Sequence, residues 1–314
     1  MAVYEHSYRQ YAGRLTPAWS RFLVIPRHAY RDVFRSKLFV AFYALCFLFP
    51  VIASCIIYLH HNVNALALLK IGDVRALAPI NASFFHYFTT FQCSLAFLLV
   101  VLVGPPLVSR DMANNALPLY LCRPFSRAEY VAGKMSVVAI LLSLVTWVPG
   151  LLLFLFQAYL EGFGWGWTNL WIAGSIFLAS AIWIVLLSLL SLSVSALVKW
   201  RVVASGALLG IFFIPSAFGE IINGLFLTRI GHLFSFGALM NNIWLGLFGL
   251  FEPVTGHIRG RISREGPFIN EPEHFVDLVL REPPLWASWF VIALVCAFCL
   301  WLLMRKVRAY EVVK

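Results

Sequence analysis

Six long apolar stretches constrain this chain more than any other feature. A helix needs about 20 consecutive apolar residues to cross the hydrocarbon core of a bilayer. Six stretches reach that length, at about 38–59, 84–104, 136–160, 170–198, 202–227 and 285–304. The chain is 61% hydrophobic and only 12% charged, which excludes both a soluble enzyme and a disordered chain. We therefore predict an all-α integral membrane protein with six transmembrane helices.

The distribution of Lys and Arg predicts how these helices are oriented. With the N-terminus inside, the inner segments carry 17 Lys and Arg and the outer loops carry 7. When the acids are included, the inner side is +12 and the outer side about −1. Cytoplasmic loops of membrane proteins collect Lys and Arg. We expect a multi-pass protein of the plasma (cytoplasmic or inner) membrane with both termini in the cytoplasm, and no nucleic-acid partner despite the net charge of +10.

The chain divides into a basic arm, residues 1–37, and a six-span domain, residues 38–314. Within the arm, residues 17–37 are predicted to form an amphipathic interfacial helix. Its basic stripe of Arg27, Arg31 and Arg35 recurs every four residues and would face anionic lipid or a partner. A solvated basic arm is the alternative reading.

Residues 228–284 form the larger outer segment, before the last span. Residues 228–251 are apolar but are interrupted by glycines and by Asn241-Asn242. A complete crossing here would put the basic C-terminal end on the wrong side of the membrane. We therefore expect a re-entrant or interfacial helical hairpin that packs against protein, followed by a polar loop at 252–284.

The sequence contains no pattern for catalysis or nucleotide binding. G-x-x-x-x-G-K-[ST], H-E-x-x-H and G-x-S-x-G are all absent. The C-x-x-C of Cys296 and Cys299 lies inside a span, where small apolar residues are expected. His60 and His61 would point apart on a helix, so a metal site is not expected there. We predict that this chain is not an enzyme and holds no metal or cofactor.

Two sets of polar residues in the spans are candidates for a transport path or gate. Glu220 is the one acid in a span, near the outer end of span five; it could line an outward gate, cap the hairpin or reach the headgroups. Ser188, Ser191 and Ser195 share one face of span four. We expect these serines to permit close helix packing. The alternative is that they line a substrate path.

The inner loop at 105–135 looks like a docking surface. It is half apolar, and Ser126 with Glu129 forms a capping box for span three. An ordered amphipathic loop is more than a tether needs, so we expect a cytoplasmic protein to bind here.

The motifs of this loop are similar to the signature of ABC-2 type transporter permeases. The matching residues are Ser109-Arg110-Asp111, Asn115-Ala116-Leu117, Pro124-Phe125-Ser126-Arg127 and Gly133-Lys134. Asn115-Ala116 replaces the usual Gly-Thr, and Pro118 stands where an acid is common. The six spans, the interfacial helix and the re-entrant stretch extend the resemblance across most of the chain.

The resemblance implies the membrane permease subunit of an ATP-driven exporter. Two permease copies would pair as a homodimer, each docked on a separate ATPase subunit that binds Mg-ATP. The implied substrate is lipid-like, amphipathic or polymeric, and its identity cannot be read from the sequence. The expected docking residues are Arg110, Asp111, Arg123, Arg127 and Glu129. The alternatives are a secondary transporter or channel not coupled to ATP and, more remotely, a membrane enzyme acting on lipid.

Overall fold

The structure is a computed structural model that describes residues 24–62, 79–114, 127–198, 200–262 and 274–306. The described residues form six helical segments that are long and apolar enough to cross a membrane. They run over Lys37–His61, Ala82–Ser109, Ala128–Glu161, Leu170–Leu197, Arg201–Phe226 and Leu285–Lys306. These segments overlap all six predicted spans, so the prediction of an all-α membrane protein with six transmembrane helices is confirmed.

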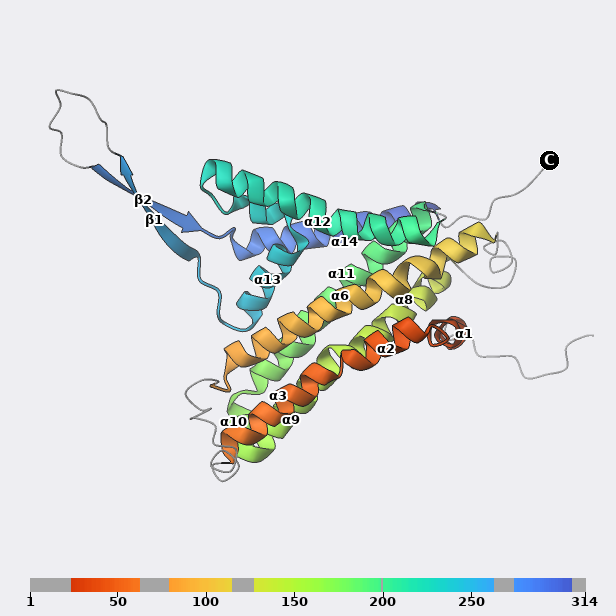
Figure 1. Cartoon of the computed structure of the whole chain (residues 1–314), viewed down its shortest axis with the longest axis horizontal. Coiled ribbons are helices and arrows are strands. Elements are labelled where there is room, and N and C mark those ends of the chain that lie inside the picture. Colours follow the sequence, from red (N-terminus) through yellow and green to blue (C-terminus); the bar gives the residue numbers. More distant parts are fainter. Residues whose placement is uncertain (1–23, 63–78, 115–126, 199, 263–273, 307–314) are drawn as a thin grey trace, which may run out of the picture.

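Helix α11 (Leu170–Leu197) forms the centre of the bundle. It contacts α6 (Ala82–Ala113), α8 (Arg127–Val145), α9 (Trp147–Glu161), α12 (Arg201–Phe226) and α14 (Leu285–Lys306). Figure 1 shows α11 lying among these helices. The residues of α11 are apolar all round with interspersed serines, which is the composition of a membrane-spanning helix.

Two spans are interrupted at positions where proline removes a backbone donor. Span one consists of α2 (Lys37–Leu45) and α3 (Leu48–His61), and Pro50 lies in the first turn of α3. Proline has no N–H, so the carbonyl of Cys46 loses its partner within the helix. The amide of Gln92, on α6, donates to that carbonyl at 2.8 Å. Span three consists of α8 and α9, and Pro149 lies in the first turn of α9. Helix α9 ends just before Gly162, and the short α10 (Phe163–Thr168) follows it.

The outer hairpin before the last span is present as two short helices. A 3-10 turn, η2 (Ile230–Phe234), precedes α13 (Phe236–Leu247). Twelve residues of α-helix span about 18 Å, too short to cross the hydrocarbon core. Helix α13 instead packs against α11, α14 and α6, and Leu239, Met240 and Trp244 are buried there. The expected hairpin packed against protein is therefore what the structure contains.

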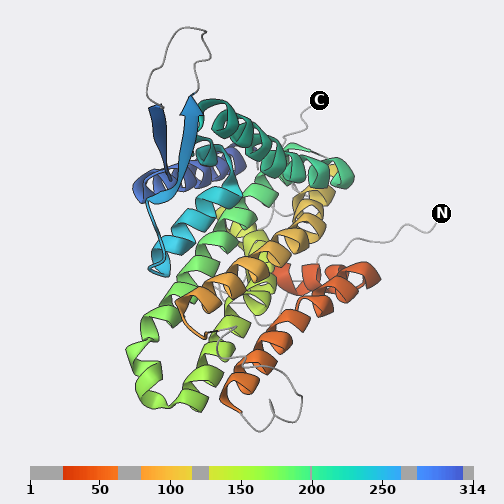
Figure 2. The same cartoon turned by 60° about the vertical axis from the view of Figure 1, so that its left-hand side comes forward.

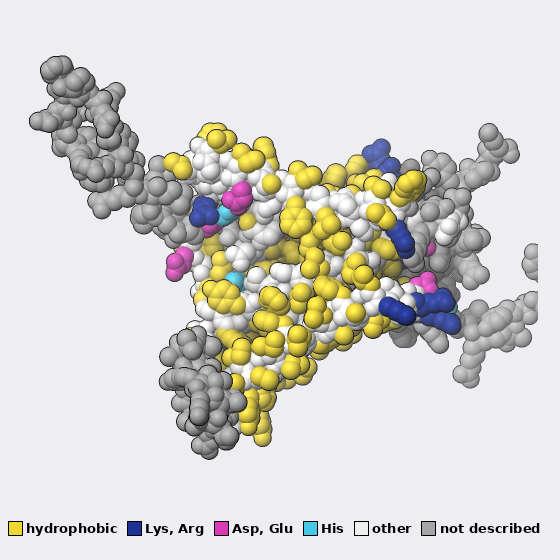
Figure 3. Space-filling model, in the orientation of Figure 1, with side chains coloured by type: hydrophobic (Ala, Val, Ile, Leu, Met, Phe, Trp, Pro, Cys, Tyr) yellow, Lys and Arg dark blue, Asp and Glu magenta, His cyan; other side chains and the backbone are white. Residues whose placement is uncertain are grey.

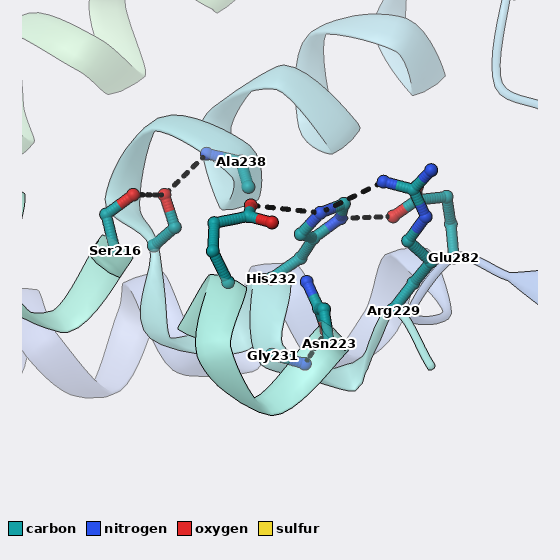
Figure 4. Close-up of polar contacts among 9 residues, drawn as sticks. Ser216, Asn223, Arg229, Gly231, His232, Ala238 and Glu282 are labelled. Atoms are coloured by element: carbon teal, nitrogen blue, oxygen red, sulfur yellow. Dashed lines mark hydrogen bonds and ion pairs between the residues drawn. The ribbon is translucent and has the colours of Figure 1, made fainter. Parts of the chain in front are cut away.

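The hairpin approaches the end of α12 very closely through two glycines. A β-carbon on Gly219 would collide with the carbonyl oxygen of Gly231, and a β-carbon on Gly231 would collide with the carbonyl oxygen of Gly219. The side-chain oxygen of Asn223 accepts from the Gly231 N–H at 2.7 Å (Figure 4). Small residues permit this backbone-to-backbone contact, as they do at helix interfaces in lipid.

The segment expected to be a polar loop contains a β-hairpin. Strands β1 (Val254–Ile262) and β2 (His274–Arg281) pair antiparallel, with Arg259 opposite Asp277 in the register. Figures 1 and 2 show this hairpin projecting away from the helical body. Apolar and polar residues partly alternate in both segments, and such alternation favours strands. The protein is therefore all-α in its membrane-spanning part and contains a β-hairpin outside it.

The two ends of the bundle differ in charge. Figure 1 places α1 (Val24–Val33) and the last residues of α14 at the end of the bundle opposite the β-hairpin. The described Lys and Arg side chains gather mainly at the end of the bundle where α1 lies, and hydrophobic side chains cover the middle of the bundle (Figure 3). The described parts of the chain nearest its two termini thus lie on one side of the bundle, as the distribution of Lys and Arg predicts.

Replacing Gly219 should reveal how much the glycine contact stabilises the outer hairpin. We expect Gly219→Ala to lower the free energy of unfolding by about 1–3 kcal/mol, because overpacked contacts force the backbone to move. Gly224→Ala, on the same helix with open space around it, should be neutral or stabilising. Thermal unfolding of both variants in detergent would check this, and equal melting temperatures for the two would contradict it.

Candidate functional site

A buried ion pair joins the two stems of the inner loop. Asp111 lies near the end of α6, and Lys134 lies in the second turn of α8. The Lys134 ammonium is 2.8 Å from a carboxylate oxygen of Asp111, and the same oxygen accepts from the Tyr130 hydroxyl at 2.7 Å. The Lys134 and Asp111 side chains are 8% and 15% exposed. Buried charges persist only when paired and hydrogen-bonded, so this cluster fixes the start and the end of the loop relative to each other.

The interfacial helix α1 is anchored on the same stem. The Tyr30 hydroxyl donates to the carbonyl oxygens of Ser136 and Val137 on α8, at 3.4 and 3.3 Å. Burial raises the pKa of Tyr30 to about 12, so the phenol keeps its proton at neutral pH. A pocket of about 220 Å³ lies between α1 and α2 on one side and α6, α8 and α12 on the other. Asp111 and Lys134 line this pocket. Helix α1 and the two loop stems therefore form one connected unit.

Among the five predicted docking residues, the structure describes the side chains of Asp111 and Glu129. Asp111 turns inward to Lys134 and Tyr130, and Glu129 is half-buried in the first turn of α8. Arg110 and Arg127 lie in α6 and α8, but their side chains are outside the described part, as is the whole of Arg123. Tyr130 and Lys134 were not predicted as site residues; the Gly133-Lys134 motif was the one signal for them.

The helix that carries the predicted basic stripe is shorter than the sequence suggests. The described part of the arm has α1 ending at Val33, so Arg35 falls in the turn before α2. Arg31 and Arg35 are both exposed, and the Arg27 side chain is outside the described part.

The serines of span four bond to a proline kink in α6. Pro105 and Pro106 lie inside α6, where proline cannot donate. The Ser195 hydroxyl donates to the Pro105 carbonyl and accepts from the N–H groups of Val108 and Ser109, at 3.2 and 2.8 Å. Ser205, on α12, donates to the Val101 carbonyl that Pro105 leaves free, at 2.9 Å. The kinked end of α6 is thereby tied to α11 and to α12.

Ser191 and Ser188, on the same face of α11, are also buried. A β-carbon on Gly104 would collide with Ser191, so α6 and α11 touch there. The Ser191 hydroxyl donates to the Ser188 carbonyl at 3.2 Å. The structure thus brings Ser191 and Ser195 together with α6, and Ser188 lies one turn away, 1% exposed.

At the opposite end, Glu220 belongs to a polar cluster that holds the outer hairpin. His232 on η2 lies 3.6 Å from Glu220 through Nε2, and 2.7 Å from Glu282 through Nδ1. The guanidinium of Arg229 approaches Glu282 at 4.0 Å. Figure 4 shows His232 beside Glu282 and Arg229. The Glu220 side chain is 64% exposed, so it lies at the outer surface and not among the buried helices.

A second imidazole–carboxylate pair ties span one to span three at the outer end. His61 Nε2 lies 2.7 Å from Glu161, and Gln157 donates to the same carboxylate oxygen at 3.4 Å. This pair accounts for His61 without a metal. Among the residues that the structure describes, no three His, Cys, Asp or Glu side chains come together as metal ligands.

The fold and these sites define a multi-pass α-helical membrane protein whose inner loop is braced by buried charges. The family model described as "ABC-2 family transporter protein" matches residues 23–240, well over half of the chain. The chain therefore belongs to the ABC-2 transporter family and is a membrane permease of an ABC-type transporter. No curated protein matches the chain. The matched region includes the inner-loop stems and the first five spans, and it ends within α13.

Breaking one partner of the inner ion pair should cost much more stability than removing both. We expect Asp111→Asn to lower the free energy of unfolding by about 3–5 kcal/mol, because it leaves the Lys134 ammonium buried without a counter-charge. The double variant Asp111→Asn with Lys134→Met should recover most of that loss. Denaturant unfolding in detergent would measure both, and a double variant no more stable than the single one would contradict the expectation.

Proposed function

We propose that this chain is the permease subunit of an ATP-driven exporter, powered by a separate ATPase docked on the loop at 105–135. The observation that carries the proposal is the Asp111–Lys134–Tyr130 cluster, because it braces the stems of the loop that the ATPase would push. The 314 residues contain no phosphate-binding loop, so Mg-ATP is assigned to the partner. In this proposal the chain itself catalyses no reaction.

The hydrogen bonds of the inner half suggest how a push would travel. Displacing the loop moves the ends of α6 and α8 together, because Asp111 and Lys134 join them. Helix α1 follows through Tyr30. The kinked end of α6 then acts on α11 through Ser195 and on α12 through Ser205. Motion at the inner surface would thereby reach spans four and five.

The proposed assembly contains two copies of this chain and two ATPase subunits in a plasma (cytoplasmic or inner) membrane. Both termini and the inner loop lie in the cytoplasm, in keeping with the excess of Lys and Arg on that side. Arg31 and Arg35 face the headgroups of anionic lipids at the inner surface, where a basic residue contributes roughly 1 kcal/mol to membrane binding. The exported molecule is lipid-like, amphipathic or polymeric.

Affinity purification in mild detergent tests the central proposal. Purified from cells that express its native neighbours, the chain should carry a stoichiometric ATPase subunit with Mg-ATP hydrolysis. Arg127→Glu combined with Glu129→Lys should reduce the retained ATPase at least about tenfold, because it reverses charges at the docking surface and roughly 1.4 kcal/mol corresponds to tenfold in binding.

The matched control for docking is Arg281→Glu, an exposed charge reversal at the opposite end of the bundle. It should leave ATPase association unchanged. A stable oligomer without any ATPase would instead favour a secondary transporter or channel not coupled to ATP. Undiminished association of the double variant would move the docking surface away from the start of α8.

Glu220 is proposed as part of an outward gate, and Ser188, Ser191 and Ser195 as the part of a transport path that lies on the inner half of α11 and opens when α6 moves. Glu220→Gln should lower the export rate about two- to fivefold, because it removes a charge that holds α12 to η2 through His232. ATPase association should stay at the level of the unchanged chain. Transport into inverted vesicles over pH 5–8 would measure this, and an unchanged rate at every pH would remove Glu220 from the gate.

A further inference from the structure

Two hollows of different character lie on either side of the start of α13. A polar pocket of about 310 Å³ opens on the outer side and includes His232, Asn241, Asn242, Glu252 and Glu282 in its lining. A groove of about 340 Å³ lies between α6, α11 and α12, lined mainly by Phe97, Leu98, Trp183, Phe212 and Phe213. Ser235 and Gly237 line the groove and Ala238 lines the pocket, so one turn of chain separates the two.

The polar pocket suits a cation that can donate hydrogen bonds. Among the described residues, its lining includes two carboxylates, two amides and one imidazole beside Leu245, Leu250 and Phe251, and neither Lys nor Arg. Glu252 is exposed and makes no ion pair with a described residue, whereas Glu282 is held by His232 and approached by Arg229. Carboxylates accept several hydrogen bonds each, so a primary ammonium has partners here.

A buried amide adds a second requirement for whatever enters the pocket. Asn242 is 4% exposed, and its side-chain nitrogen has no hydrogen-bond partner. Burying such a donor without a partner costs roughly 1–3 kcal/mol. Asn242 lines the polar pocket, so an acceptor oxygen of a bound molecule would relieve that cost once the amide turns its nitrogen toward the pocket. The pocket therefore calls for an ammonium group close to an ester or phosphate oxygen.

The groove suits an acyl chain that enters from the surrounding bilayer. The Phe97 and Phe212 rings lie 4.3 Å apart, and Trp183 packs against Phe212. Leu98 and Phe213 are 44% and 62% exposed on the outside of their spans, so the groove meets the apolar exterior of the bundle. Trp183 donates its N–H to the Cys93 carbonyl at 2.8 Å, which leaves an apolar face toward the groove.

We propose that the start of α13 is a binding site for a membrane amphiphile, with a primary-ammonium head in the polar pocket and an acyl chain in the groove. This inference rests on the proposed transport function and names its substrate class. It excludes a hydrophilic polymer at this site, because a polymer has no group to fill the groove. Glu252 and Glu282 bind the head, and Leu98 and Phe213 border the entrance for the chain.

Photolabelling of the full chain in phosphatidylglycerol nanodiscs tests the proposal. The probes are phosphatidylethanolamine, phosphatidylcholine and phosphatidylglycerol, each carrying the same diazirine on one acyl chain. Mass spectrometry of the peptides that contain Leu98 and Phe213 should show at least about threefold more label from phosphatidylethanolamine than from the others. That ratio is what one ion pair with hydrogen bonds contributes in a partly exposed site. Unlabelled phosphatidylethanolamine should compete.

Three variants separate binding from folding. Glu252→Gln with Glu282→Gln should reduce phosphatidylethanolamine labelling to the level of phosphatidylcholine, and Glu252→Gln alone should lower it part of the way. Leu98→Trp should fill the groove and remove the excess of label from phosphatidylethanolamine over the other two lipids. Glu161→Gln, a carboxylate at the same end of the bundle outside the pocket, should leave the labelling unchanged.

Equal labelling by the three lipids would overturn the proposal, as would label spread evenly over the exposed faces of α12 and α14. A cross-link between two copies at the groove would overturn it too, by assigning the groove to the dimer contact. The labelling requires neither ATP nor the ATPase. A chain that binds phosphatidylethanolamine here but recruits no ATPase would therefore refute the proposed function and leave the site standing.

Discussion

Hydrogen bonding of the backbone inside lipid is the constraint on which the rest of this structure depends. No water is present in the hydrocarbon core to satisfy a free carbonyl, so a carbonyl freed by a proline in a span needs another partner, and a neighbouring helix can supply it. Gln92 meets it for the carbonyl freed by Pro50, and Ser205 meets it for the carbonyl freed by Pro105. Each of these bonds joins two different spans. The bonds that satisfy the carbonyls freed by proline are therefore also contacts that pack the spans together.

This dependence makes α6 the helix through which the inner end acts on the core. Pro105 and Pro106 lie in the half of α6 nearer the inner end, and Ser195 accepts there from the N–H groups of Val108 and Ser109. Just beyond the kink, Asp111 is fixed to Lys134 on α8. A rigid loop stem joined to a kinked helix can transmit a displacement, because the bonds at the kink connect to α11 and α12 and not to solvent. The serines thus serve packing and, in the proposed mechanism, transmission.

The spans were predictable because each is a long apolar run whose length alone decides the assignment. The short hairpin at 228–251 was predictable from its glycines and from the charge at the C-terminal end. The contacts of Ser195 with Pro105, of Asp111 with Tyr130 and of His232 with Glu282 were not, because 90, 19 and 50 residues separate the partners and they lie in different segments of the chain. Periodicity places a residue on a face of its helix, but it does not identify the helix that the face meets. The strands at 254–281 were not predicted, because the charged residues of this segment indicated a loop, although apolar and polar residues partly alternate there.

The two ends of the bundle are held with different strength, and this difference bears on where the protein opens. At the inner end, Lys134 and Asp111 are almost entirely removed from solvent, and separating such a pair costs about 3–5 kcal/mol. At the outer end, His232 and Glu282 are 13% and 10% exposed and lie 2.7 Å apart, whereas Glu220 is 64% exposed and its pair with His232 contributes about 1 kcal/mol or less. The contact between α12 and η2 also includes side chains, because Asn223 accepts from the Gly231 N–H and the Phe218 and Phe234 rings lie 5.7 Å apart. A force applied to the braced inner loop would therefore break the Glu220–His232 pair between α12 and η2 before the His232–Glu282 pair.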